Sequence, residues 1–155
     1  MNVTVYVVRH AKAGSRSAWK GADDLRPLSR AGRKQADALV GLLGEADVTR
    51  IVSSPYVRCR QTVEPLAQGL RIPVDLAEAL AEGALLTEVL RLVEKVGDEE
   101  AVLCTHGDVV EALLEYLHDR PRVRVHGDAY EKGSTWALEV RSGSVRSARY
   151  LEPPA

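Results

Sequence analysis

Short, continuously apolar runs alternate with longer amphipathic segments along most of this chain. Such runs are typical of strands covered on both faces, and the amphipathic segments have the spacing of helices packed against a sheet. Strand-like runs lie at 3–8, 50–53, 74–76, 101–105, 134–140 and 145–151. Segments with helical spacing lie at 30–44, 56–70, 85–95 and 108–118. Repeated alternation of strand and helix predicts an α/β sandwich with a largely parallel central sheet.

Three local features refine this expectation. Ser29 precedes the first helical segment and is expected to cap it, since a serine hydroxyl accepts a hydrogen bond from a free N–H of the first turn. Pro65 has no N–H and is expected to kink or break the second helix. The segment 11–29 and the segment after Asp119 have little periodicity and are expected to be loops, which often carry function.

Composition limits the classes of protein that the chain can belong to. Its 155 residues suit one domain, so 1–155 is expected to fold as a single unit. Twenty-one basic and 22 acidic side chains give a net charge of −1, which provides no overall attraction to a nucleic acid polymer or an anionic membrane. No apolar run is long enough to span a bilayer, no basic leader is evident, and only two cysteines occur. We therefore expect a cytoplasmic protein.

Histidines directly follow two of the predicted strands. The first strand leads into Arg9 and His10, and the strand at 101–105 leads into His106. In an α/β sheet, ligands bind beyond the carboxyl ends of the strands. One histidine at a strand end is more often structural than catalytic, but two at equivalent ends predict a shared site.

Arg58 is predicted to lie in the first turn of the second helix, after Ser54 and Pro55. A cation is disfavoured there because the helix dipole is positive, so the arginine indicates an anionic ligand, with a surface ion pair as the alternative. Together with Arg9 and the two histidines, Arg58 would form a cationic pocket suited to a phosphoryl group. In such a pocket a neutral imidazole can attack phosphorus without a metal.

These motifs resemble the signature of the histidine phosphatase superfamily, whose fold is called phosphoglycerate mutase-like. The signature has an Arg-His pair after the first strand, Ser-Ser-Pro followed by an arginine and Gln-Thr, and a later His-Gly. This chain has Arg9-His10, the segment 53–62, and His106-Gly107. The resemblance implies a three-layer α/β/α sandwich.

Two branches of the superfamily are particularly similar to this chain. The stretch 26–36 is similar to the SixA-type phosphohistidine phosphatases. The segments 10–21, 61–67 and 132–136 are similar to the phosphatase-like half of actinobacterial MutT-type Nudix proteins, although no Nudix segment is expected here.

The resemblance also assigns roles to individual residues. It implies that His10 is the nucleophile that becomes phosphorylated, and that Arg9, Arg58 and His106 hold the phosphoryl oxygens, with no metal or other cofactor. A further donor is expected from the loop 12–17. The superfamily usually has glycine where this chain has Ala11, and the extra methyl group is expected to narrow the approach to the phosphate.

The proton donor remains open between Glu82, Glu78 and no residue at all. Superfamily members commonly place an acid after the third strand, and Glu82, in Leu-Ala-Glu, fits the usual Leu-x-Glu pattern best. SixA-type enzymes are similar in lacking an obvious acid, because a protonated phosphohistidine is a good leaving group.

Other phosphate chemistries are not supported by the sequence. Neither Cys59 nor Cys104 has an arginine six places later, as a cysteine phosphatase loop requires, and neither a Walker loop nor a Gly-x-Ser-x-Gly elbow occurs. His10 and His106 lack the closely spaced companions of a typical zinc site.

The first functional hypothesis is a SixA-like phosphatase that hydrolyses phosphohistidine on a partner protein. The alternative is a phosphomonoesterase or phosphoanhydride hydrolase that acts on a small metabolite or nucleotide. A catalytically silent phosphate-binding module is disfavoured because His10 and both arginines are retained. A mutase is least favoured, since a short chain has little inserted structure to exclude water. An open pocket would admit a histidine displayed on another protein, which ranks the first hypothesis slightly ahead.

Overall fold

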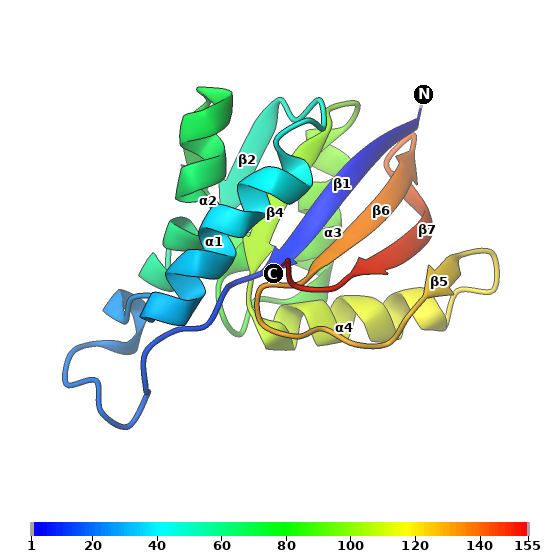
Figure 1. Cartoon of the computed structure of the whole chain (residues 1–155). Helices are drawn as coiled ribbons and strands as arrows, with labels where there is room; N and C mark the ends of the chain where they lie inside the picture. The colour runs from blue at the N-terminus through cyan, green and yellow to red at the C-terminus, as the bar shows by residue number, and fades with distance from the viewer. Residues whose placement is uncertain (1, 155) are drawn as a thin grey trace.

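The computed structural model describes residues 2–154, which form a seven-stranded sheet with helices on both faces (Figure 1). The strands are β1 (Asn2–Arg9), β2 (Arg50–Ser53), β3 (Val74–Leu76), β4 (Ala101–Thr105), β5 (Arg124–His126), β6 (Thr135–Arg141) and β7 (Ser144–Leu151). Their spatial order is β3-β2-β4-β1-β6-β7-β5. Among these strands β6 alone runs antiparallel to its neighbours, which confirms the largely parallel sheet.

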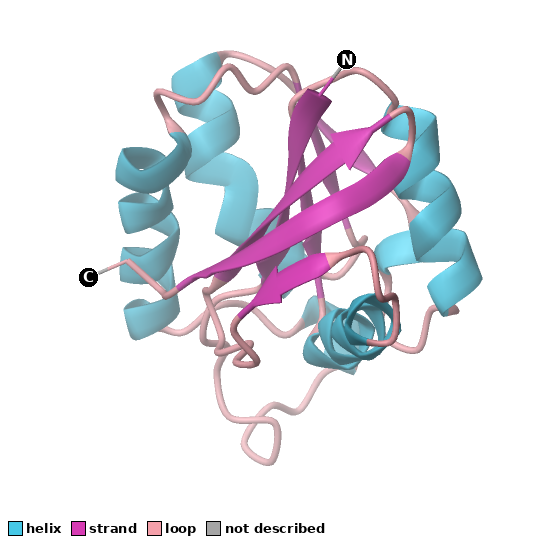
Figure 2. Cartoon of the chain, turned by 90° about the vertical axis from the view of Figure 1, so that its right-hand side faces the viewer, coloured by secondary structure: helices cyan, strands magenta, loops and turns pink. Residues whose placement is uncertain are grey.

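Four helices cover the sheet in two pairs, and two short 3-10 turns lie in its connections. The helices are α1 (Arg30–Leu43), α2 (Val57–Leu70), α3 (Leu86–Val96) and α4 (Gly107–His118), and the turns are η1 (Asp23–Leu25) and η2 (Glu78–Leu80). Helices α1 and α2 contribute to one buried cluster, whereas α3 and α4 contribute to the other (Figure 2). The three-layer α/β/α sandwich is therefore confirmed.

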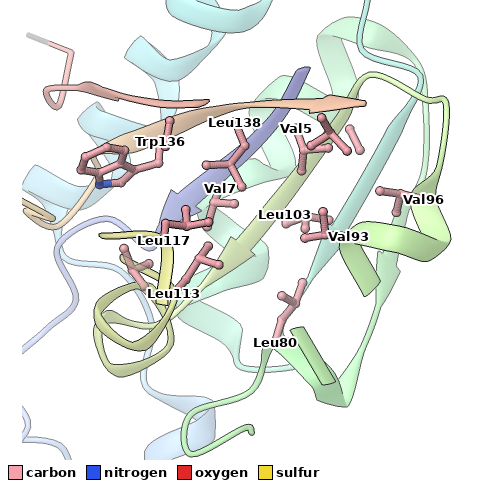
Figure 3. Close-up of a cluster of buried hydrophobic side chains, with 14 of the residues drawn as sticks. Val5, Val7, Leu80, Val93, Val96, Leu103, Leu113, Leu117, Trp136 and Leu138 are labelled. Atoms are coloured by element: carbon pink, nitrogen blue, oxygen red, sulfur yellow. The ribbon is translucent and has the colours of Figure 1, made fainter. Parts of the chain in front are cut away.

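Successive side chains of β1 point to opposite faces of the sheet, so the strand contributes to a buried cluster on each face. Val5 and Val7 pack with Leu103 and with Leu113 of α4 (Figure 3), whereas Val8 packs with Leu39 of α1 in the opposite cluster. Full burial of one such side chain contributes about 1.5–3 kcal/mol. Because both faces are covered, the strands are fixed in place and their carboxyl ends form a rigid edge.

The expected element boundaries hold in most places. Ser29 caps α1 as expected, because the Gly32 N–H donates to its Oγ at 3.1 Å. The β6–β7 hairpin turns at Ser142 and Gly143, whose φ angles of 50° and 78° match the right-handed twist of the strands.

Two expectations were wrong. The break expected at Pro65 does not occur: helix α2 continues through it, because the proline removes a single N–H while Val63 and Leu66 on either side are buried in the core. The segment after Asp119 contains β5, a three-residue edge strand paired with β7 that is too short to show alternation in the sequence.

None of the described helices is both long and apolar enough to cross a membrane.

Candidate active site

Strand register brings the two histidines together. Arg9 of β1 pairs with Thr105 of the parallel neighbour β4, and the next residue on each strand is a histidine. The rings of His10 and His106 meet edge to face with their centroids 5.4 Å apart. The two histidines therefore lie together at the carboxyl edge of the sheet, where ligands bind in α/β folds.

His10 presents its Nε2 atom as a free nucleophile. Its Nδ1 atom lies 2.7 Å from the Ala11 carbonyl oxygen, which can only accept, so Nδ1 carries the proton and Nε2 carries the lone pair. Burial, together with the positive charges of Arg58 and Arg9, lowers the pKa of His10 to about 4. The ring is therefore neutral at neutral pH, in the form that can attack phosphorus.

His106 is arranged as a hydrogen-bond donor. Its Nε2 lies 2.8 Å from Ser54 Oγ, and the Tyr56 N–H donates to the same oxygen at 3.2 Å, which leaves the serine proton for Nε2. Burial, followed by the charges of His10 and Arg58, lowers the pKa of His106 to about 3. A neutral ring that accepts at Nε2 carries its proton on Nδ1, and this buried atom has no partner within residues 2–154.

Arg58 lies fully buried beneath two carboxylates. Its guanidinium donates to the Asp23 backbone oxygen at 2.8 Å, to Asp23 Oδ2 at 3.1 Å and to Glu82 Oε1 at 3.4 Å, and it stacks over the Tyr56 ring. Arg58 thus forms the ion pair that the sequence left as an alternative to an anionic ligand. Its acidic partners, Asp23 and Glu82, lie beside the candidate site and not on a remote surface. Its Nε, also buried, has no partner among the described residues.

Arg9 is held by a hydrogen bond to the backbone of the segment that precedes β6. Its NH1 donates to the Tyr130 carbonyl oxygen at 2.7 Å, while its Nε lacks a partner in the part of the chain that the structure describes. A Cβ atom at Gly107 would lie 2.6 Å from Arg9 NH2. A side chain at position 107 would therefore require this guanidinium to shift.

A cleft of about 710 Å³ opens at this edge of the sheet, and Arg58 and His106 are not among its lining residues. His10 and Arg9 line it, as do Gly14, Ser15 and Arg16 from the loop 12–17 that was expected to supply a donor. Glu82 also lines it, with Oε1 lying 3.5 Å from Arg16 NH2 and 3.4 Å from Arg58 NH2. Glu78 is exposed at the start of η2 and does not line the cleft.

The structure adds two cations that the sequence analysis did not select. Arg26 is 6% exposed, lines the cleft, and donates to Gly14 O at 2.6 Å and to Asp23 Oδ1 at 3.0 Å. Lys132 lines the cleft from the segment before β6. Both lie in stretches that carry a family resemblance, and this was the only signal that could have found them.

The methyl group of Ala11 does not narrow the cleft as expected. Ala11 is fully buried in a small cluster with Leu28 and Ala36, under the loop that leads to α1, and it does not line the cleft. The approach to His10 is therefore unaffected by this departure from the usual glycine.

No group of three or more histidine, cysteine, aspartate or glutamate side chains between residues 2 and 154 is placed to hold a metal ion.

The layer order, the sheet topology and the placement of the edge residues together define a phosphoglycerate mutase-like fold. The chain belongs to the histidine phosphatase superfamily (branch 1), whose family model matches residues 5–87. It is 42% identical over 156 residues to the 8-oxo-(d)GTP phosphatase of Mycolicibacterium smegmatis, an alignment that covers 97% of this chain and 48% of that protein. The chain thus spans about half the length of this curated relative.

Solved structures agree with this fold. The protein histidine phosphatase SixA complexed with tungstate superposes with a TM-score of 0.76 at 17% identity, covering 99% of this chain and 97% of that one. A mycobacterial glucosyl-3-phosphoglycerate phosphatase superposes with a TM-score of 0.72 at 18% identity, covering 100% of both chains. At these identities the likeness shows the shared fold.

Proposed function

We propose that this protein is a metal-independent phosphatase that works through a phosphohistidine at His10. One observation carries the proposal: a neutral His10 with a free Nε2 lies among three buried donor atoms that lack partners within the described chain. These atoms are Arg9 Nε, Arg58 Nε and His106 Nδ1. Buried donors are rarely left unpaired, and phosphoryl oxygens would satisfy them.

The reaction proceeds in two displacements. Nε2 of His10 forms a bond to phosphorus while the bond to the leaving group breaks, and the leaving group takes the electron pair. Water then attacks the phosphohistidine and releases inorganic phosphate and neutral His10. The guanidinium groups of Arg9 and Arg58 stabilise the negative charge on the transferring oxygens in both steps.

For the substrate class, we infer a small phosphoanhydride, such as a nucleotide with two or more phosphates. The 42% identical relative is an 8-oxo-(d)GTP phosphatase, which favours the alternative from the sequence analysis. Glu82 Oε1 is already engaged by two guanidinium groups, so the site favours a leaving group that departs without a strong proton donor. A phosphate leaving group meets that condition, whereas a simple alcohol does not.

Phosphohistidine on a partner protein is the second candidate, because imidazole meets the same leaving-group condition. The rim of the cleft is open to solvent at Arg16, whose side chain is 68% exposed, so a displayed histidine ring has a route toward His10. The fold shared with SixA is consistent with this substrate.

A substrate panel with a matched control variant tests both the role of His10 and the substrate class. His10→Ala should reduce turnover of every substrate by about 10³-fold or more and abolish the acid-labile phosphoenzyme, while the fold persists. His118→Ala, which removes an exposed histidine at the end of α4, should leave turnover unchanged. Parental rates in His10→Ala would overturn the mechanism. Comparison of a nucleoside diphosphate with a phosphohistidine protein then separates the two substrate classes.

A further inference from the structure

Two cations that line the cleft, Arg9 and Lys132, have no acidic partner among the described residues, and Arg9 already donates to the Tyr130 carbonyl oxygen. Lys132 makes no ion pair in the described part of the chain, although three carboxylates line the same cleft. Each of those acids is engaged elsewhere: Glu82 pairs with two arginines, Glu111 accepts from the Tyr130 hydroxyl at 3.0 Å, and Asp108 accepts from the Gly83 N–H at 2.8 Å. The ammonium group of Lys132 is therefore a cation available to a ligand.

The backbone at Lys132 is fixed beside the nucleophile. The N–H of Gly133 donates to the carbonyl oxygens of Arg9 and His10, at 3.1 and 3.0 Å. Gln35 donates through Nε2 to the Lys132 oxygen at 3.2 Å and accepts from the Lys12 N–H at 2.9 Å. Hydrogen bonds on both sides of the residue thus hold it against the segment that carries His10.

The packing around Gly133 makes this placement specific. Its φ of +84° lies in the left-handed region, and a Cβ atom there would lie 2.9 Å from Gln35 Nε2. Lys132 therefore directly precedes a turn in which a side chain would not fit. The positive charge of Lys132 also helps to lower the pKa of His10.

The cleft is larger than the transferring phosphoryl group requires. Arg9, Arg58 and His106 already offer buried donor atoms without partners among the described residues, and the His106 ring contacts the His10 ring. The volume of about 710 Å³ lies within the range of small-molecule pockets, about 300–1,000 Å³. His10 and Lys132 both line this cleft, which has room for a further part of the substrate.

We propose that Lys132 binds the second phosphate of the substrate, next to the phosphoryl group that His10 removes. The inference rests on the proposed function and narrows it to phosphoanhydrides, such as nucleoside di- or triphosphates. When Nε2 bonds to phosphorus, the bridging P–O bond breaks and the bridging oxygen keeps the electron pair. The leaving phosphate then carries additional negative charge, which the lysine ammonium neutralises without any proton transfer.

Lys132→Met tests the proposal because it removes the charge and keeps most of the side-chain length. Charged hydrogen bonds are worth about 1.5–3 kcal/mol, so we expect kcat/KM for GDP to fall about tenfold or more. With p-nitrophenyl phosphate, which has no second phosphate, kcat/KM should change less than about threefold. Lys132→Arg should retain most of the preference for GDP. Lys20→Met, an exposed cation of the 11–29 loop outside the cleft lining, is the matched control.

An inhibition measurement gives the same comparison without turnover of a diphosphate. Lys132→Met should weaken competitive inhibition by pyrophosphate about tenfold and leave inhibition by inorganic phosphate unchanged. Equal loss for both inhibitors, or no loss for pyrophosphate, would overturn the subsite. A parent protein that hydrolyses p-nitrophenyl phosphate through His10 but leaves GDP intact would also overturn it while preserving the role of His10. Full activity in His10→Ala would instead overturn the proposed function itself.

Discussion

Asp23 accepts hydrogen bonds from Arg58 through two different oxygens, its backbone carbonyl at 2.8 Å and Oδ2 at 3.1 Å. Its other carboxylate oxygen, Oδ1, accepts from Nε of Arg26 at 3.0 Å. A single acid in the 11–29 loop thus orients two buried arginines of the site. The loop fixes the direction of the guanidinium groups in addition to forming one side of the cleft.

Asp23→Asn should lower kcat/KM by about tenfold, because Arg58 and Arg26 lose a charged partner and no longer hold one direction. Steady-state kinetics and inhibition by vanadate would measure the effect. Asp24→Asn alters the exposed neighbouring acid and should change neither quantity. Identical kinetics in the two variants would contradict the orienting role of Asp23.

Arg58→Lys should weaken inhibition by phosphate or vanadate about tenfold and lower turnover as well. Lysine keeps the positive charge but loses the planar fork that can donate to phosphoryl oxygens while still pairing with Asp23. Arg60→Lys changes an exposed residue of the same helix and is the control. Unchanged vanadate inhibition in Arg58→Lys would remove Arg58 from the phosphate site.

Thr62→Val should destabilise the fold by about 1–3 kcal/mol, since it leaves a buried N–H unsatisfied. The hydroxyl accepts from the Ala11 N–H at 3.0 Å and donates to the Arg58 carbonyl at 2.7 Å, so it joins the nucleophile segment to α2. Urea unfolding measures the loss, and Thr62→Ser should restore most of it. Equal stabilities for the valine and serine variants would show that this link contributes nothing.

Gly32→Ala and Gly41→Ala should have opposite effects although both lie in α1. A Cβ atom at position 32 would lie 1.8 Å from the Lys12 oxygen, whereas nothing lies within 4 Å of one at position 41. Alanine normally stabilises a helix by about 0.8–1.0 kcal/mol relative to glycine, so Gly41→Ala should raise the melting temperature. Gly32→Ala should lower it and reduce activity, because the loop beside His10 must move. A stabilised Gly32→Ala protein would contradict this packing.

Acidification should destabilise the protein from about pH 6.5 downward. The folded pKa of His10 is lowered to about 4 from 6.5, chiefly by burial, and that of His106 to about 3. Between pH 6.5 and the lowered folded pKa, the unfolded chain binds protons that the folded protein does not. The stabilisation from the two neutral histidines is therefore fully present above pH 6.5 and is lost as pH falls toward 4. Each histidine contributes at most about 1.4 kcal/mol per pH unit.

Urea unfolding of the parent and of His10→Gln between pH 7.5 and 4.5 isolates the contribution of His10. The variant should lose stability less steeply. Parallel curves for the two proteins would show that His10 does not carry the depressed pKa.

Much of this fold could be predicted from the sequence because the signals were local. Apolar runs such as 101–105 and the cap at Ser29 depend on neighbouring residues, and both lie where they were expected. Strand β5 and the uninterrupted helix at Pro65 depend on packing with distant segments, which local patterns do not contain.

The same distinction applies to the site. His10 and His106 were predictable as a pair because each follows a recognisable strand, and the parallel register then aligns them. The hydrogen bonds between Arg58 and Asp23 and between Gln35 and Lys132 could not be predicted. Asp23 lies in the irregular 11–29 loop and Lys132 in the segment before β6, and neither segment has a periodicity that would place its residues. Side-chain contacts across loops are decided by the completed three-dimensional structure.

The pairing of Arg9 with Thr105 has a consequence for how this protein comes to be active. The two imidazoles become neighbours only when the first strand and a strand from the later part of the chain have joined in one register, since a shift of a single residue turns every side chain of a strand to the opposite face. Catalytic competence should therefore arrive late and all at once during folding. Recovery of turnover after dilution from denaturant would then report completion of the central sheet.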